Sequence, residues 1–259
     1  MSNSIGTLAW TRSTGGELSA AESRSLMGEL LRAQLTLIPE EWLHNRGIRR
    51  PRTSGLSAED LMPPDSAAAT GASNACREIS PEYLYNHCAR SYGWARVLGA
   101  QLGVQPDPEL LYVAAMFHDF GLTESYGAQE KRPVCFAAIG AHEAARKLAD
   151  AGWDAERIDR VCEAITLHLN IGVNLSYGPE AHLLNLATAL DTTGLRKWRL
   201  TADDLAMVLD GHPRLDQDQA LASCFMSEAK RFPRSRAGWL EQNVKFSKRL
   251  RRAPFGDRA

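Results

Sequence analysis

The sequence predicts an all-α protein, and two observations support this. From residue 80 onward, apolar residues recur at helical spacing, whereas the alternation of apolar and polar residues typical of strands is scarce. Helix start signals, Ser80-Pro81-Glu82 and Asp107-Pro108-Glu109, and a terminating Gly103 divide this pattern into segments of helical length. We expect Ser80 and Asp107 to cap their helices.

The chain divides into three parts that we expect to form one compact domain. Residues 1–79 combine an amphipathic helix at 18–37 with an irregular connection at 48–74, which is rich in Pro, Ser, Ala and Gly. We expect residues 80–195 to form the core, which the polar residues described below make a metal-binding one, and residues 196–259 to add helices that pack on it. In these two parts we expect helices at 80–102, 107–120, 134–151, 154–168, 180–193, 217–232 and 237–252, and one starting at Thr201.

Composition excludes several classes of partner. Lys and Arg number 30 and Asp and Glu number 31, so the net charge of −1 gives no electrostatic footprint for nucleic acid or an anionic membrane. No apolar run has the roughly 18–20 residues of a membrane span, and no secretion signal is evident. The five cysteines form no CxxC pair, which argues against a zinc–thiolate site. We expect a cytoplasmic protein.

Five polar residues interrupt apolar helical segments. His118 and Asp119 follow the most hydrophobic run in the chain, and His87, His168 and Asp191 lie in three other segments. A buried carboxylate is costly unless it is paired, hydrogen-bonded or bound to metal. A shared metal ion would account for these residues together, although a single histidine could be a satisfied core residue and Asp191 could bond a loop amide. Nitrogen and oxygen ligands of this kind suit Zn²⁺, Fe²⁺ or Mn²⁺.

In these segments the sequence resembles the HD-domain superfamily of metal-dependent enzymes. The resemblance rests on residues 86–92 (NHCARSY), 110–123 (LLYVAAMFHDFGLT), 164–168 (AITLH) and 187–194 (ATALDTTG). It implies an all-α HD-domain helical bundle with additional N- and C-terminal helices. It also implies that the metal ligands are His87, His118, Asp119 and Asp191.

Two departures from the family pattern bear on the number of metal ions and on the kind of substrate. Leu122 stands where many HD phosphohydrolases carry a phosphate-binding lysine, and Phe136 stands where dinuclear members have an additional histidine. His168 matches the other additional ligand position but lacks this companion. We therefore expect one divalent metal ion.

Within the superfamily, three segments look most like the cyanamide hydratase branch: HDFGLT, RPVCFAAIGA at 132–141, and ATALDTTG. This resemblance implies zinc as the metal, with iron or manganese as alternatives, and hydration of a small nitrile such as cyanamide to urea. We expect Asp119 and His168 to be catalytic. The expected substrate-binding residues, around a small apolar pocket, are Phe117, Phe120, Thr123, Lys131 and Phe136.

Other functions stay open at this point. An HD-type phosphohydrolase acting on a nucleotide or phosphate ester would need cations facing the metal, for which Arg90 and Lys131 are candidates. A non-enzymatic binding module would not need the full ligand set, and a di-iron oxygenase is disfavoured by Phe136. The expected partner is a small-molecule substrate. Apolar stripes on the terminal helices suggest either a homo-oligomer interface or packing of these helices back on the core.

Overall fold

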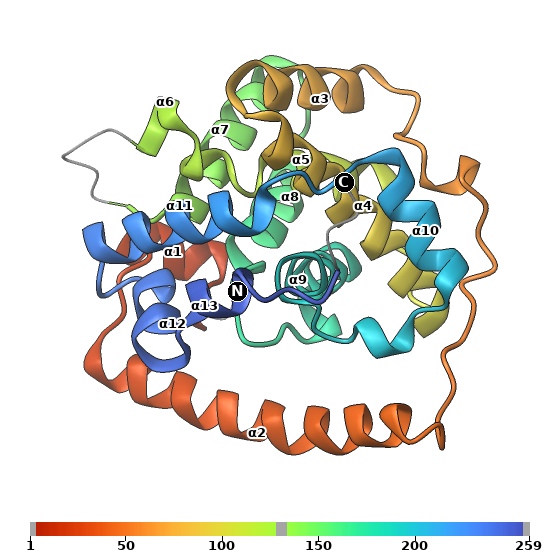
Figure 1. Ribbon diagram of the computed structural model, residues 1–259. Coiled ribbons are helices and arrows are strands. Elements are labelled where there is room, and N and C mark those ends of the chain that lie inside the picture. The colour runs from red at the N-terminus through yellow and green to blue at the C-terminus, as the bar shows by residue number, and fades with distance from the viewer. Residues whose placement is uncertain (1–3, 128–133, 256–259) are drawn as a thin grey trace.

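The computed structural model describes residues 4–127 and 134–255, and it confirms the all-α prediction. Within these residues the helices pack into one bundle (Figure 1), and the only strand-like pairing is an isolated bridge between Glu17 and Ser235. No helix in the described part of the chain is long and apolar enough to cross a membrane.

The α-helices occupy most of the described chain. In order they are α1 (Leu8–Thr14), α2 (Ala20–Asn45), α3 (Ala67–Ile79), α4 (Glu82–Leu102), α5 (Pro108–Phe117), α6 (Glu124–Gly127), α7 (Phe136–Asp150), α8 (Ala155–Leu167), α9 (Pro179–Thr193), α10 (Ala202–Gly211), α11 (Gln217–Arg231), α12 (Arg236–Val244) and α13 (Phe246–Leu250). Short 3₁₀ turns lie between them: η1 (Glu59–Leu61), η2 (Phe120–Leu122), η3 (Leu175–Tyr177) and η4 (Lys197–Arg199).

Helix α5 is the centre of the bundle. Every residue from Leu110 to Phe117 is buried, as expected for a helix that is apolar on all sides. It packs against α3, α4, α7, α8 and α9. The Asp107 carboxylate caps it as predicted, accepting the backbone N–H groups of Glu109 and Leu110 at 2.9 and 3.2 Å.

The predicted cap at Ser80 is wrong. Helix α4 begins after Pro81, which provides no side-chain cap, while Ser80 terminates α3 and its hydroxyl lies 3.6 Å from the Cys76 sulfur. Because α3 runs almost directly into α4, Ser80 is used at the end of the first helix instead of the start of the second.

Two other element boundaries differ from the expectation. The end of the predicted connection is helical, because α3 begins at Ala67 after a cap by Ser66, and its small residues pack closely on α5. The predicted helix at 237–252 is broken at Lys245, whose left-handed backbone (φ 51°) ends α12 before α13.

Helix α2 extends further than predicted and is held at its two ends. At its start, the Glu22 carboxylate accepts a hydrogen bond from Trp10 Nε1 at 2.6 Å and completes a capping box with Ser19. Near its end, Glu40 forms a two-pronged ion pair with Arg199 of η4 at 2.5 and 2.6 Å. The helix runs along the base of the molecule below α9, α12 and α13 (Figure 1).

The outer side of α2 is unusually apolar. Among its residues only Leu26 is buried. Exposed large apolar side chains on this side include Leu31, Leu35 and Trp42. The homo-oligomer interface inferred from the terminal helices stays a prediction, and this face of α2 is where it would form.

Two glycines allow α7 to approach the end of α5 closely. A Cβ atom at Gly140 of α7 would collide with the Phe117 carbonyl oxygen, and one at Gly121 of η2 would collide with the backbone of Phe136. The approach is therefore backbone against backbone, and it positions the turn that carries His118.

Replacing Gly140 with alanine is expected to lower the free energy of unfolding by about 1–3 kcal/mol, because the two backbones must separate. Chemical denaturation measures this effect. Gly71 of α3 is the matched control, since a Cβ there meets no atom within 4 Å. Gly71→Ala should leave stability unchanged or raise it by up to about 1 kcal/mol. Equal losses in both variants would contradict the close-approach argument.

Candidate metal centre

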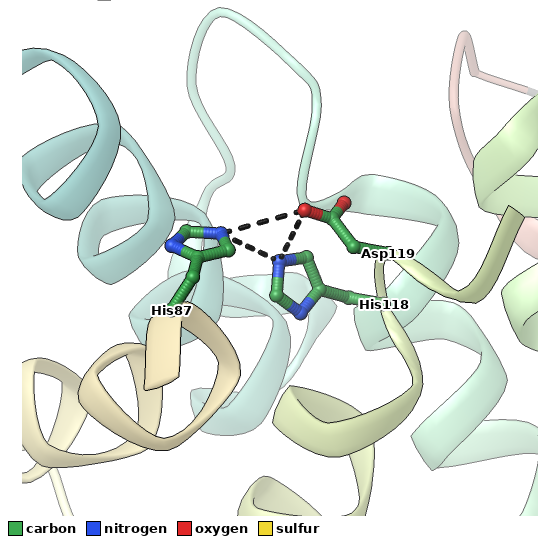
Figure 2. Close-up of side chains that lie close together, drawn as sticks. All are labelled: His87, His118 and Asp119. Atoms are coloured by element: carbon green, nitrogen blue, oxygen red, sulfur yellow. Dashed lines mark hydrogen bonds and ion pairs between the residues drawn. The ribbon is translucent and has the colours of Figure 1, made fainter. Parts of the chain in front are cut away.

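Three buried donor atoms converge at the end of α5. They are His87 Nε2 from α4, His118 Nε2 and Asp119 Oδ2 (Figure 2). The two histidine nitrogens lie 3.1 Å apart, and each lies 3.4 Å from the Asp119 oxygen. The structure thus brings together three of the four predicted ligands.

The end of α5 explains how adjacent residues reach one point. Side chains of neighbouring residues in a helix project about 100° apart. His118 still has helical angles, but Asp119 (φ −107°, ψ 11°) has left the helix, which turns its carboxylate back toward the imidazole. The helix thus ends at Phe117, three residues before the predicted boundary at residue 120.

Hydrogen bonds at Nδ1 determine where the imidazole lone pairs lie. His118 Nδ1 lies 2.8 Å from the Ala115 carbonyl oxygen, and His87 Nδ1 lies 2.7 Å from the Asp191 carboxylate. Carbonyl and carboxylate oxygens only accept, so each Nδ1 carries the hydrogen and each neutral ring presents its lone pair at Nε2. Two lone pairs and the Asp119 carboxylate therefore face one another inside the protein.

This donor set fits a divalent metal ion. Donors bound tetrahedrally at about 2.0 Å from zinc lie about 3.3 Å apart, which matches the separations of 3.1 and 3.4 Å. Electron-rich atoms that converge without an intervening cation repel one another, and a metal removes that repulsion. The set of two nitrogens and one oxygen does not distinguish zinc from iron or manganese.

Asp191, the fourth predicted ligand, is not brought to this cluster. Its carboxylate lies on the Nδ1 side of His87, away from Nε2. It also accepts hydrogen bonds from Trp94 Nε1 at 2.7 Å, from Gln217 Nε2 at 2.9 Å and from Arg90 at 2.8 and 3.0 Å. These bonds occupy both oxygens, so in this arrangement Asp191 orients the imidazole of a metal ligand.

Arg90 is committed to this buried network. It is fully buried, and besides Asp191 it donates to the backbone carbonyls of His212 and Pro213 at 2.7 and 3.1 Å. Burial raises the pKa of Asp191, but Arg90 and His87 outweigh it and hold that pKa well below the usual range. From the sequence, Arg90 was a candidate for binding a phosphate. Its hydrogen bonds instead connect α4 to α9 and to the segment before α11.

A proton and a metal ion compete for the same three donors. Burial lowers the pKa of His87, but its bonds to Asp119 and Asp191 outweigh this and raise the pKa above the ordinary 6.5. Burial likewise raises the pKa of Asp119, and His118 and His87 bring it well below its usual range. Asp119 is therefore a carboxylate at neutral pH.

His168 lies beside the cluster as a neutral base. Its Nδ1 donates to the Ile165 carbonyl at 2.6 Å, so Nε2 is an acceptor, and this atom lies 3.7 Å from Asp119 Oδ1. Burial and the neighbouring His118 lower the pKa of His168 to about 3. The ring packs edge-on against Phe136, with the centroids 5.6 Å apart.

The donors open into a cavity of about 390 Å³. Of the predicted substrate-binding residues, Phe136 lines the cavity. Leu122, which was not among them, lines it too. Phe117 and Phe120 do not, because they pack on each other in the core with centroids 4.4 Å apart. The Thr123 hydroxyl donates to the Phe120 carbonyl, and Lys131 lies outside the described residues.

Sequence reasoning missed the wall that α2 contributes to this cavity. Leu30, Ala33 and Leu37 line it from one side of the helix. The sequence did offer one signal of this wall: the predicted amphipathic helix has more apolar residues than are needed to pack one of its faces on the core. Where that helix would dock depends on the pairing of Glu40 with Arg199, which spacing alone does not reveal.

Comparison with known families agrees with the geometry. Residues 84–193 match the family model of the HD domain, a segment that holds His87, His118, Asp119 and Asp191. Proteins with this domain are typically metal-dependent enzymes. No curated protein matches the chain.

Elemental analysis of the purified protein is expected to find one metal ion per chain. His118→Ala and Asp119→Ala should lose it, because each removes a donor. Asp191→Asn should retain the ion with roughly 10–100-fold weaker affinity, since it perturbs only the orientation of His87. Asp150→Asn is the control, as this side chain is 72% exposed. Complete metal loss in a folded Asp191→Asn variant would identify Asp191 as a ligand instead.

Metal affinity is expected to weaken as the pH falls, starting above pH 6.5. Below the raised pKa of His87 a proton must leave for the metal to bind, so affinity should drop about tenfold per pH unit. Competition with a chelator between pH 6 and 8.5 measures this. A constant affinity down to pH 6.5 would contradict the raised pKa.

Proposed function

Because residues 84–193 match the HD-domain family model, we propose that this protein is a mononuclear metal-dependent hydratase that adds water to a nitrile group, with cyanamide as the simplest substrate. The observation that carries the proposal is the arrangement of one His-His-Asp cluster, a neutral His168 and an adjoining cavity with apolar walls. Water addition needs a base beside an electrophile, and this arrangement provides both.

The charges around the cavity favour a neutral substrate. Phosphoryl transfer depends on cations that neutralise the phosphate oxygens. Among the described lining residues, Arg249 is the one lysine or arginine. It lies on α13, and Arg90 is bonded within the Asp191 network. These observations support a hydratase over the alternative phosphohydrolase.

Phe136 supports a mononuclear centre. Its ring packs against His168, where a second metal would need another nitrogen or oxygen donor. Among the described residues the one group with metal-ligand geometry is His87, His118 and Asp119.

A divalent ion held by this cluster would polarise the nitrile and lower the pKa of water from about 15.7 toward 7. His168 Nε2, the lone-pair atom that faces Asp119, accepts a hydrogen bond from the attacking water and relays its proton to the nitrile nitrogen, so that the imidazolium that burial disfavours does not accumulate. The free Oδ1 of Asp119 keeps that water oriented. As the C=O double bond of the product forms, both π bonds of the nitrile and both O–H bonds of water break, and both protons finish on nitrogen, which gives an amide, or urea from cyanamide.

The cavity walls near these groups are apolar, so a bound nitrile would displace water that no side chain there holds. Phe136, Leu122 and Leu221 line the cavity near these groups and offer no hydrogen bonds from their side chains. Excluding bulk water strengthens the electrostatic interactions between the metal centre and a bound nitrile.

Metal-loaded protein is expected to convert cyanamide to urea, measured by a coupled urea assay. His168→Gln should lower kcat by roughly 10²–10⁴-fold while retaining the metal, because the base is lost and the ligands are not. His142→Gln is the control, since His142 is exposed on α7.

Two results would overturn the proposal. One is the absence of turnover with cyanamide and with every other nitrile despite one bound metal per chain. The other is phosphate release from a nucleotide panel that depends on the same metal, which would establish the phosphohydrolase.

A further inference from the structure

The cavity beside the metal centre is far larger than cyanamide requires. Its volume is about 390 Å³, whereas a water molecule in the liquid occupies about 30 Å³. Space for roughly ten or more non-hydrogen atoms is therefore available, as in pockets that enclose drug-sized ligands. Cyanamide would fill only the end at the metal.

The cavity has one polar end and an apolar body. The polar end carries His87, His118, Asp119 and His168. Away from this end, the charged groups among the described lining residues are Glu41 and Arg249. Between them the walls are largely aliphatic and aromatic, with Leu37, Phe225, Leu240, Val244 and Phe246.

Most of the apolar body is built outside the HD-domain segment. Helices α2, α11, α12 and α13 contribute Leu37, Phe225, Val244 and Phe246, and none of these lies within residues 84–193. Helix α2 runs across the base of the molecule, α12 and α13 lie above it, and α11 lies farther up (Figure 1). The metal centre thus lies within the segment that matches the family model, whereas most of the apolar wall of the cavity comes from helices outside that segment.

Helix α2 covers the cavity without filling it. Its ends are held by Trp10–Glu22 and by Glu40–Arg199, as described above. Between these anchors Leu30, Ala33 and Leu37 face the cavity, and none of the three is buried. A ligand with an apolar surface would remove these side chains from water, which favours its binding.

We propose that the substrate of this site is a neutral nitrile with an extended apolar substituent, which lies beneath α2 while the nitrile carbon reaches the metal centre. The inference rests on the hydratase function proposed above and specifies its substrate class. The reaction is R–C≡N + H₂O → R–CO–NH₂, in which nothing is oxidised or reduced and no other reactant is needed.

The test combines turnover with a binding measurement that does not depend on turnover. A series of unbranched alkyl nitriles, from acetonitrile to nonanenitrile, is assayed for amide formation by metal-loaded protein. Binding is followed with N-phenyl-1-naphthylamine, a neutral apolar dye that fluoresces in apolar pockets, and with its displacement by the same nitriles.

A matched pair of variants on α2 locates the effect. Ala33→Trp adds a large side chain to the cavity wall, whereas Leu35→Trp adds one to the outer face, where Leu35 is 75% exposed. Circular dichroism checks that both are folded. Ala33→Leu provides a smaller obstruction in case the first variant does not fold.

The expected result is that kcat/KM rises roughly fourfold for each added methylene until the cavity is full. Nitrile affinity measured by dye displacement should rise in parallel. Ala33→Trp should weaken dye binding about tenfold or more and flatten the length dependence, while Leu35→Trp behaves as wild type.

Turnover of cyanamide with no length dependence and no dye binding would overturn this inference and leave the hydratase function intact. Length-dependent binding without hydration of any nitrile would overturn the proposed function, and with it the nitrile assigned here. Equal effects of Ala33→Trp and Leu35→Trp would show that the dye and the nitriles bind elsewhere.

Discussion

The mutual repulsion of His87 Nε2, His118 Nε2 and the Asp119 carboxylate is the constraint on which the rest of the structure depends. Their separations of 3.1 and 3.4 Å are stable in a buried environment only when a proton or a metal ion lies among them. The surroundings hold the donors in place despite this repulsion. Asp191 and Ala115 fix the hydrogens on the two imidazoles, and the glycine contacts of α7 and η2 hold the turn that carries His118.

Much of this centre could be predicted from the sequence, because ionisable groups in apolar helices need a reason to be there. His87, His118 and Asp119 were found this way. The position of Asp191 relative to His87 was not, since it depends on how α4 and α9 pack and on the guanidinium of Arg90. A carboxylate beside an imidazole can be a second ligand or the partner of the first, and helical spacing does not distinguish the two.

The errors in the fold have a similar origin. Residues 67–74 were predicted to be part of a connection because alanine, serine and glycine also dominate flexible segments, yet here small side chains let α3 pack closely on α5. The left-handed backbone at Lys245 is carried by a residue with no preference for it, so the break between α12 and α13 has no sequence signal. The cavity likewise results from helices far apart in the chain, and its apolar lining reads in each helix as ordinary core.

The two-ended attachment of α2 has a consequence for how the protein can change. Its first turns are held by Glu22 and by the buried Leu26, and its end is held by Glu40, whereas the turns from Ala33 to Leu37 place no residue in the core. Ala33 and Leu37 in this span are only partly buried and line the cavity beside the metal centre, where the substituent of the proposed nitrile would lie. New substrate preferences could evolve through this span by single substitutions, while the metal ligands and their supporting network stay as they are.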